Sequence, residues 1–189
     1  MNKLKVEIGG GDMPRPSFEQ LDSRIGFNLI SDDLPYEDNS IDIIYMSHII
    51  EHIPLYNAQE VLTKIYNKLK VGGFVRILCP DLEKIIQAYV DKDELAFSRN
   101  KNHWGTVTFL NSQLGIGGMF INQILSPGGD IDFYVGEKKI SSYAHVAGYD
   151  FEMIRNLLKI VGFIKIKRTP IIPFDTHQLP GQLVVNAWK

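Results

Sequence analysis

The chain has 189 residues, of which 44% are hydrophobic and 22% charged. This composition excludes a disordered or fibrous protein and predicts a single domain over residues 1–189. Its 20 basic and 22 acidic side chains give a net charge of −2, so we expect neither a nucleic-acid-binding protein nor one attached to a membrane surface. The one cysteine excludes an intramolecular disulfide, and no signal peptide or membrane-spanning stretch is recognisable. We therefore expect a soluble cytoplasmic protein.

The first predicted strand runs into a glycine turn. Residues 4–8 alternate between apolar and polar side chains and are followed by Gly9, Gly10 and Gly11. Prolines at positions 14 and 16 oppose a full helix directly after this turn. Further strands are expected over residues 18–22, 26–30, 41–46, 74–79, 164–167 and 183–188.

Three segments between these strands have helical spacing. Asn57 and Glu60 have the form of a capping box in front of the first, and Gly72-Gly73 is expected to end it. Asp81 and Asp150 are expected to cap the other two. Strands that alternate with helices predict an α/β fold, with a mostly parallel, doubly wound sheet covered on both faces. Residues 91–149 fit this alternation poorly and are interpreted as an insertion or lid on the substrate side.

The glycine turn alone is weak evidence for a nucleotide site. A dinucleotide site requires a third glycine, a helix and an acidic residue about 20 positions further on. Here position 14 is Pro14, and Asp22 follows Gly11 by only eleven positions. These features disfavour a nicotinamide-dependent dehydrogenase.

The same residues suit an adenosyl ligand with a cationic end. Asp22 can accept hydrogen bonds from both hydroxyls of a ribose. Glu7 can orient either the glycine loop or a ligand ammonium group. Asp32 and Asp33 follow the third predicted strand, close to where an adenine would lie.

Four motifs over residues 5–80 carry a family resemblance. They are Val6-Glu-Ile-Gly-Gly-Gly11, Asp33-Leu-Pro-Tyr-Glu-Asp-Asn-Ser-Ile-Asp42, Ile43-Ile-Tyr-Met-Ser-His-Ile-Ile-Glu-His52 and Leu69-Lys-Val-Gly-Gly-Phe-Val-Arg-Ile77. In this order and spacing, they resemble the class I S-adenosylmethionine (SAM)-dependent methyltransferases. The Gly11–Asp22 spacing is similar to that of a subgroup of short bacterial methyltransferases of type 11.

This resemblance implies a Rossmann-like sheet of seven strands in the order 3-2-1-4-5-7-6, with a shortened or missing first helix and an insertion after strand 5. It also implies SAM as cofactor and S-adenosylhomocysteine (SAH) as product. Ile30 departs from the pattern, because many relatives carry an acidic residue there. The cofactor-binding residues implied are Glu7, Gly9, Gly10, Gly11, Asp22, Ser31, Asp32, Asp33, Ser47 and His48.

The acceptor side is less defined by sequence. A hydroxyl acceptor needs a proton acceptor, and His145 and His48 are the candidates. His48 and His52 have metal-ligand spacing but lack an obvious third ligand, so no metal is expected. We expect methylation of a small molecule, such as a sugar or another hydroxyl acceptor. A catalytically degenerate SAM-binding or interaction protein on the same fold is the alternative, and a homodimer stays open.

Overall fold

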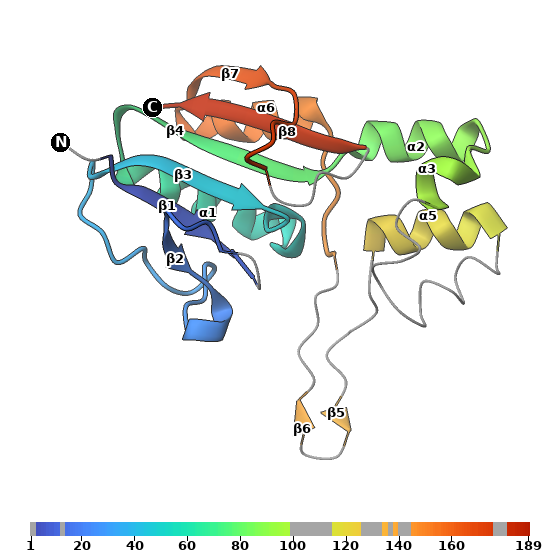
Figure 1. The fold of residues 1–189 in the computed structure, drawn as a ribbon, viewed down its shortest axis with the longest axis horizontal. Coiled ribbons are helices and arrows are strands. Elements are labelled where there is room, and N and C mark those ends of the chain that lie inside the picture. The colour runs from blue at the N-terminus through green and yellow to red at the C-terminus, as the bar shows by residue number, and fades with distance from the viewer. Residues whose placement is uncertain are drawn as a thin grey trace.

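A mostly parallel β-sheet forms the centre of the protein (Figure 1). The structure is a computed structural model that describes residues 3–11, 14–98, 115–125, 134–135, 138–139, 145–175 and 181–189. The strands of this sheet are β1 (Lys5–Ile8), β2 (Glu19–Leu21), β3 (Ile41–Ser47), β4 (Leu69–Pro80), β7 (Ile164–Arg168) and β8 (Gln182–Trp188).

The strands lie in the order β2-β1-β3-β4-β8-β7. The first four are parallel, whereas β8 runs antiparallel to both β4 and β7. The α/β class and the mostly parallel sheet are thus confirmed. Because the first four strands are parallel, their carboxyl ends meet at one edge of the sheet, where sites in such folds form.

Seven strands were expected, but the described residues form a sheet of six. The expected strand over residues 26–30 is wrong, because this segment forms a loop. Asn28 donates its N–H to Asp32 Oδ2 at 2.8 Å, and the Asn28 Oδ1 atom accepts from the N–H of Ile30 at 3.0 Å. These side chains occupy backbone groups that a strand would pair with its neighbour, which favours a turn. Among the described residues 14–18 there is also no helix, in agreement with the expected loss of the first helix.

The helices fall into two groups. Two long helices, α1 (Leu55–Lys68) and α6 (Phe151–Val161), pack together against the sheet. Three others, α2 (Leu82–Val90), α3 (Glu94–Ser98) and α5 (Gly115–Leu125), contact one another beyond the carboxyl ends of β3 and β4 (Figure 1). The smaller elements are the 3-10 turns η1 (Ser23–Ile25) and η2 (Ile50–His52) and the strand pair β5 (Tyr134–Val135) and β6 (Lys138–Lys139).

The helix ends agree only in part with the sequence signals. Asp150 caps α6, since its Oδ1 atom accepts from the N–H of Met153 at 2.8 Å. The capping box at Asn57 is wrong, because α1 begins at Leu55, directly after Pro54. Gly72-Gly73 does not end this helix but lies within β4. Asp81 precedes α2 without a side-chain capping bond and pairs with Arg168 instead.

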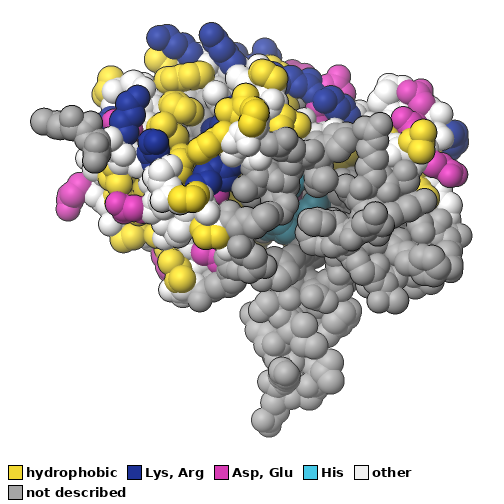
Figure 2. Space-filling view, in the orientation of Figure 1, with side chains coloured by type: hydrophobic (Ala, Val, Ile, Leu, Met, Phe, Trp, Pro, Cys, Tyr) yellow, Lys and Arg dark blue, Asp and Glu magenta, His cyan; other side chains and the backbone are white. Residues whose placement is uncertain are grey.

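The two faces of the sheet are covered differently. On one face, α1 and α6 bury a continuous apolar core that includes Ile44, Leu62 and Ile154. The opposite face carries a small cluster of Phe18, Tyr45, Leu78 and Val184. No helix of the described residues packs on this face, and hydrophobic and basic side chains gather on it (Figure 1 and Figure 2). Both helices that pack on the sheet therefore lie on the same side.

Part of the 91–149 segment lies outside the described residues. The described part places α3 and α5 beside α2, and residues 145–149 return to the edge of the sheet. There Tyr149 pairs with Asp81, and the carbonyl of Tyr149 accepts from the N–H of Leu82 at 2.9 Å. Among the described residues, no helix is long and apolar enough to cross a membrane.

Candidate functional site

The glycine loop after β1 comes close to the neighbouring strands. Gly9 and Gly11 have φ values of +74° and +57°, which favour glycine. The N–H of Gly9 donates to the carbonyl of Leu21 at 2.8 Å. A Cβ atom on Gly9 would lie 1.9 Å from Cδ1 of Ile49, so only glycine fits this position. The loop therefore lies directly on the ends of β2 and β3.

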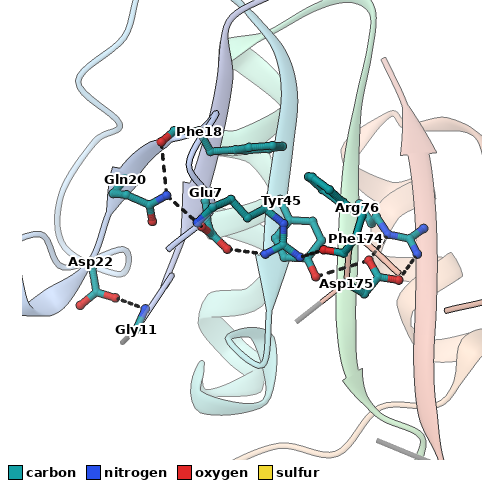
Figure 3. A network of polar contacts seen from close by, with 10 residues as sticks. Glu7, Gly11, Phe18, Gln20, Asp22, Tyr45, Arg76, Phe174 and Asp175 are labelled. Atoms are coloured by element: carbon teal, nitrogen blue, oxygen red, sulfur yellow. Dashed lines mark hydrogen bonds and ion pairs between the residues drawn. The ribbon is translucent and has the colours of Figure 1, made fainter. Parts of the chain in front are cut away.

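Asp22 is next to this loop. It follows β2, and its Oδ2 atom accepts from the N–H of Gly11 at 3.1 Å (Figure 3). The side chain is only partly buried. The structure thus brings together the glycines and the carboxylate that the sequence separates by eleven positions.

Glu7, in β1, is buried and contacts the segments that follow the glycine loop. Its Oε2 atom accepts from the N–H of Arg15 at 2.7 Å and from Nε2 of Gln20 at 2.8 Å. Its Oε1 atom forms an ion pair with Arg15 at 2.7 Å, and Glu7 is 1% exposed. These contacts join β1 to Arg15 and to β2, and the predicted orientation of the glycine loop by Glu7 stays a prediction. A direct contact with a cofactor stays a prediction.

Arg15 is a residue that sequence reasoning missed. Its guanidinium lies 3.4 Å from the ring centroid of Tyr45 and 4.5 Å from that of Phe174. It also donates to the carbonyl of Phe174 at 2.7 Å. Stacking on aromatic rings and pairing with a carboxylate are the contacts that an arginine makes best. Arg15 thereby ties the glycine loop to the segment that precedes β8.

The candidates for the adenine side form a tight loop of their own. Asp32 accepts from the N–H of Asn28 and, at 2.9 Å, from the hydroxyl of Ser31. The bond from Asn28, followed by that from Ser31, lowers the pKa of Asp32. Asp33 instead pairs with Lys68 at 2.9 Å, and this contact lowers the pKa of Asp33. Lys64 donates to the carbonyls of Ile30 and Asp32 and so fixes the loop on α1.

Ser47 and His48 lie at the carboxyl end of β3. Ser47 is buried, and its hydroxyl has no hydrogen-bond partner in the described part of the chain. His48 has a φ of +56°, a left-handed conformation that side chains rarely adopt. Its Nδ1 atom lies 2.9 Å from Oε1 of Glu51, and its Nε2 atom lies 2.6 Å from Nε2 of Gln182. His48 therefore links β3 to β8 through its ring.

Glu51 joins the two predicted catalytic histidines. Its Oε1 atom contacts His48 and also lies 3.9 Å from Nε2 of His145. Burial by itself raises the pKa of Glu51, but the hydrogen bond from His48 and the charges of the nearby histidines outweigh it, so the pKa lies below its ordinary value. Burial lowers the pKa of His145 to about 4, which leaves the ring neutral at pH 7.

A hollow lies beside this cluster, between the end of β4 and the helices beyond it. Glu51 Oε2 and the hydroxyl of Tyr149 are buried without hydrogen-bond partners in the described part of the chain. Burial also raises the pKa of Tyr149 to about 12, so its hydroxyl stays protonated. Histidine side chains are visible near the centre of the molecule (Figure 2). The hollow is lined by Glu51, Pro80, Leu82, Ile85, Gln123, Ile124, His145, Ala147, Gly148 and Tyr149.

Comparison with known proteins supports the resemblance. A family model described as "Methyltransferase domain" matches residues 27–77. A solved SAM-dependent methyltransferase from Thermotoga maritima, described as a possible histamine N-methyltransferase, aligns with a TM-score of 0.51 at 15% identity over 100% of this chain and 83% of that chain. The chain has the class I SAM-dependent methyltransferase fold.

Two further proteins are similar to this chain. The structure of PigF with SAH aligns with a TM-score of 0.51 at 13% identity, over 99% of this chain and 56% of that chain. Phosphoethanolamine N-methyltransferase 2 of Caenorhabditis elegans is 41% identical over 61 residues, which are 31% of this chain. The match covers only 13% of that curated relative, so it extends to a small part of its length.

The methyltransferase fold and the site geometry are compatible with an adenosyl cofactor. Gly9 and Gly10 let the loop pack closely against Ile49 and Gln20, and Asp22 lies beside the loop with a carboxylate suited to ribose hydroxyls. Ser47 adds a buried hydroxyl without a partner in the described residues. Sequence reasoning found these residues but missed Tyr149 and the pairing role of Glu51. The motif containing Glu51-His52 was the available signal for Glu51, whereas nothing in the sequence indicated Tyr149.

Proposed function

We propose that this chain is a SAM-dependent methyltransferase with a small-molecule acceptor. The observation that carries the proposal is the juxtaposition of the glycine loop and Asp22 at the carboxyl ends of parallel strands. A small hollow lined by Glu51, His145 and Tyr149 lies beyond the end of β4, and it would have to widen to admit a second substrate. Sites at this edge of the sheet are the rule in open α/β folds.

The residues divide into a cofactor side and an acceptor side. SAM supplies an activated methyl group, so the protein mainly needs to align the partners and exclude water. On the cofactor side, the loop glycines would accept the close approach of the ligand, and Asp22 would bind the ribose hydroxyls. On the acceptor side, the neutral ring of His145 would accept a proton from a hydroxyl. His48 is the rival base, although both of its ring nitrogens already have contacts.

The acceptor class is proposed from the character of the hollow. Its lining combines apolar side chains with the polar groups of Glu51, His145 and Tyr149, which is the mixture that small-molecule sites carry, and the hollow would open further when an acceptor binds. We propose a hydroxyl-bearing acceptor, such as a sugar. The C. elegans relative, which is named for phosphoethanolamine, also supports a small acceptor, although the match is short.

The first experiment is binding. Isothermal titration with SAH should show one site, and saturating SAH should raise the melting temperature by linkage. The same titration with NADH serves as the control for a dinucleotide site. A wild-type protein that shows no heat with SAH and no change in its melting curve would rule out the proposed cofactor.

The second experiment is turnover. SAM labelled in its methyl group is incubated with a panel of sugars and other hydroxyl compounds, and transfer of label is measured. Replacement of the candidate base, His145→Gln, should lower turnover by about 10²–10⁴-fold and leave SAH affinity nearly unchanged. The matching His48→Gln substitution should also weaken SAH binding, because His48 follows Ser47 at the end of β3. SAH binding without transfer to any acceptor would favour the catalytically degenerate alternative.

A further inference from the structure

Three side chains with metal-binding atoms meet beside the hollow. The candidate ligand atoms of Glu51, His52 and His145 all lie within 4.8 Å of one another. The rings of His52 and His145 are nearly perpendicular, with centroids 4.9 Å apart. Glu51 and His52 come from η2 after β3, whereas His145 comes from the segment that returns from the insertion. The cluster is therefore formed by folding and not by a local sequence motif.

The carboxylate of Glu51 is the second observation that points to a ligand. Glu51 is 1% exposed, and its Oε1 atom contacts His48. Its Oε2 atom is buried and has no hydrogen-bond partner among the described residues. A buried carboxylate oxygen without a partner is costly, and native proteins rarely leave one so. A bound cation would satisfy it.

The backbone holds the cluster together from both sides. The carbonyl of Glu51 accepts from the N–H groups of Val146 and Ala147 at 2.9 and 3.1 Å, which fixes His145 next to Glu51. The ring of His48 orients the Glu51 carboxylate from the other side. Hydrogen bonds of this kind to a carboxylate ligand are typical of metal sites, where outer groups orient the ligands.

We propose that Glu51, His52 and His145 bind a divalent transition-metal ion such as Zn²⁺. Two imidazoles and one carboxylate are a common ligand set for such ions and leave coordination positions open. Bonds of about 2.0–2.2 Å require ligand atoms about 3–3.5 Å apart. The candidate ligand atoms of the three side chains lie within 4.8 Å of one another, so the side chains must move closer together to hold an ion.

The acceptor would occupy the open coordination positions of the metal ion. Glu51 and His145 both line the hollow, so an ion held by them borders the space in which we place the acceptor. The ion would lower the pKa of an acceptor hydroxyl, and the released proton would pass to His48, because the His145 nitrogen that binds the ion cannot accept it. This role rests on the proposed function, whereas the metal site itself does not.

Metal binding is tested directly on the whole chain. The protein is treated with EDTA, desalted and titrated with ZnCl₂ by calorimetry, and CoCl₂ is added separately to record visible absorption. We expect one Zn²⁺ per chain and a Co²⁺ spectrum of low coordination number. A hundredfold excess of Zn²⁺ over its dissociation constant should raise the melting temperature by about 5–10 °C.

Variants assign the ligands. Glu51→Gln and His145→Gln should each reduce Zn²⁺ affinity by at least tenfold and remove the metal-dependent shift in melting temperature. Glu60→Gln, at an exposed position of α1, is the matched control and should bind as the wild type does. Each variant is first melted in EDTA, so that a loss of folding is separated from a loss of binding. Because His145→Gln changes a different segment of the chain from Glu51→Gln, either variant alone can test the site.

Two results would overturn the metal site. One is a folded wild-type protein that takes up neither Zn²⁺ nor Co²⁺, and the other is Zn²⁺ binding that both variants retain at full affinity. SAH titration of the same samples keeps the two proposals apart. Metal binding without SAH binding would refute the proposed cofactor and support the metal site. SAH binding without metal binding would support the cofactor and refute the metal site.

Discussion

Gly10 gives a sharp test of how the glycine loop is held. A Cβ atom at this position would lie 2.2 Å from Oε1 of Gln20 and 3.1 Å from Oε2 of Glu7. Unlike Gly9 and Gly11, Gly10 does not have a positive φ, so the backbone itself accepts alanine. In Gly10→Ala the Gln20 amide must therefore move, and it loses its 2.8 Å bond to the buried Glu7 carboxylate.

The magnitude follows from these two effects. A hydrogen bond to a charged group contributes about 1.5–3 kcal/mol. Replacing glycine with alanine restricts the unfolded chain, which stabilises the folded protein by about 0.4–1 kcal/mol. Gly10→Ala should therefore destabilise the protein by about 1–2 kcal/mol, or lower the melting temperature by about 2–8 °C for a chain of this size.

A double-mutant cycle isolates the cause. In the Gln20→Ala background the amide is absent, so Gly10→Ala should cost much less, with a coupling of about 1–2 kcal/mol between the two positions. Urea denaturation of the four proteins measures this coupling. Gly117→Ala in α5 is the control, because its Cβ would meet nothing within 4 Å and should stabilise the helix slightly. Equal costs of Gly10→Ala in both backgrounds would refute the explanation.

Three other predictions concern single charged groups. Asp22→Ala should weaken SAH binding by about 1.5–3 kcal/mol, or roughly 10–150-fold in dissociation constant, and calorimetry against Asp38→Ala checks it. The hydrogen bond from Lys70 lowers the pKa of Asp42, so its stabilisation exists above the ordinary value of 3.8 and disappears as pH falls through the lower folded value. Asp42→Asn should therefore be less stable than wild type at pH 7 but converge with it in acid, as urea unfolding between pH 2 and 7 can show. Arg76→Leu leaves the buried Asp175 carboxylate without its ion-pair partner and should cost about 3–5 kcal/mol, with much of this recovered when Asp175→Asn is added.

The central strands were predictable because their pattern is simple. Ile41–Ser47 is rich in isoleucine and is buried along most of its length, and such a segment has few alternatives to a parallel strand. The segment 26–30 shows the limit of this reasoning. Its apolar residues suggested a strand, but the hydrogen bonds of Asn28 and Asp32 that prevent one depend on side-chain geometry.

In the candidate site, too, residues close together in the sequence were predictable, whereas contacts between remote residues were not. Gly9–Gly11 and Asp22 were found because the glycine requirement and the spacing can be seen within one short segment. His52 was rejected as a metal ligand because its only apparent partner was His48, one helical turn away. The structure instead puts His52 beside Glu51 and His145, and the distance in sequence between positions 52 and 145 hid this contact. Arg15 escaped notice for a similar reason, since its aromatic partners Tyr45 and Phe174 are remote in the chain.

The position of β8 within the sheet has a consequence for biosynthesis. β8 lies between β4 and β7, yet the ribosome makes it after both. Until residues 182–188 have been synthesised, β4 has an unpaired edge and β7 has no neighbour in the sheet. Open strand edges with apolar side chains are where nascent chains associate wrongly. A growing chain of this protein should therefore depend on chaperones most strongly just before β8 emerges, and this dependence should end when β8 inserts between β4 and β7.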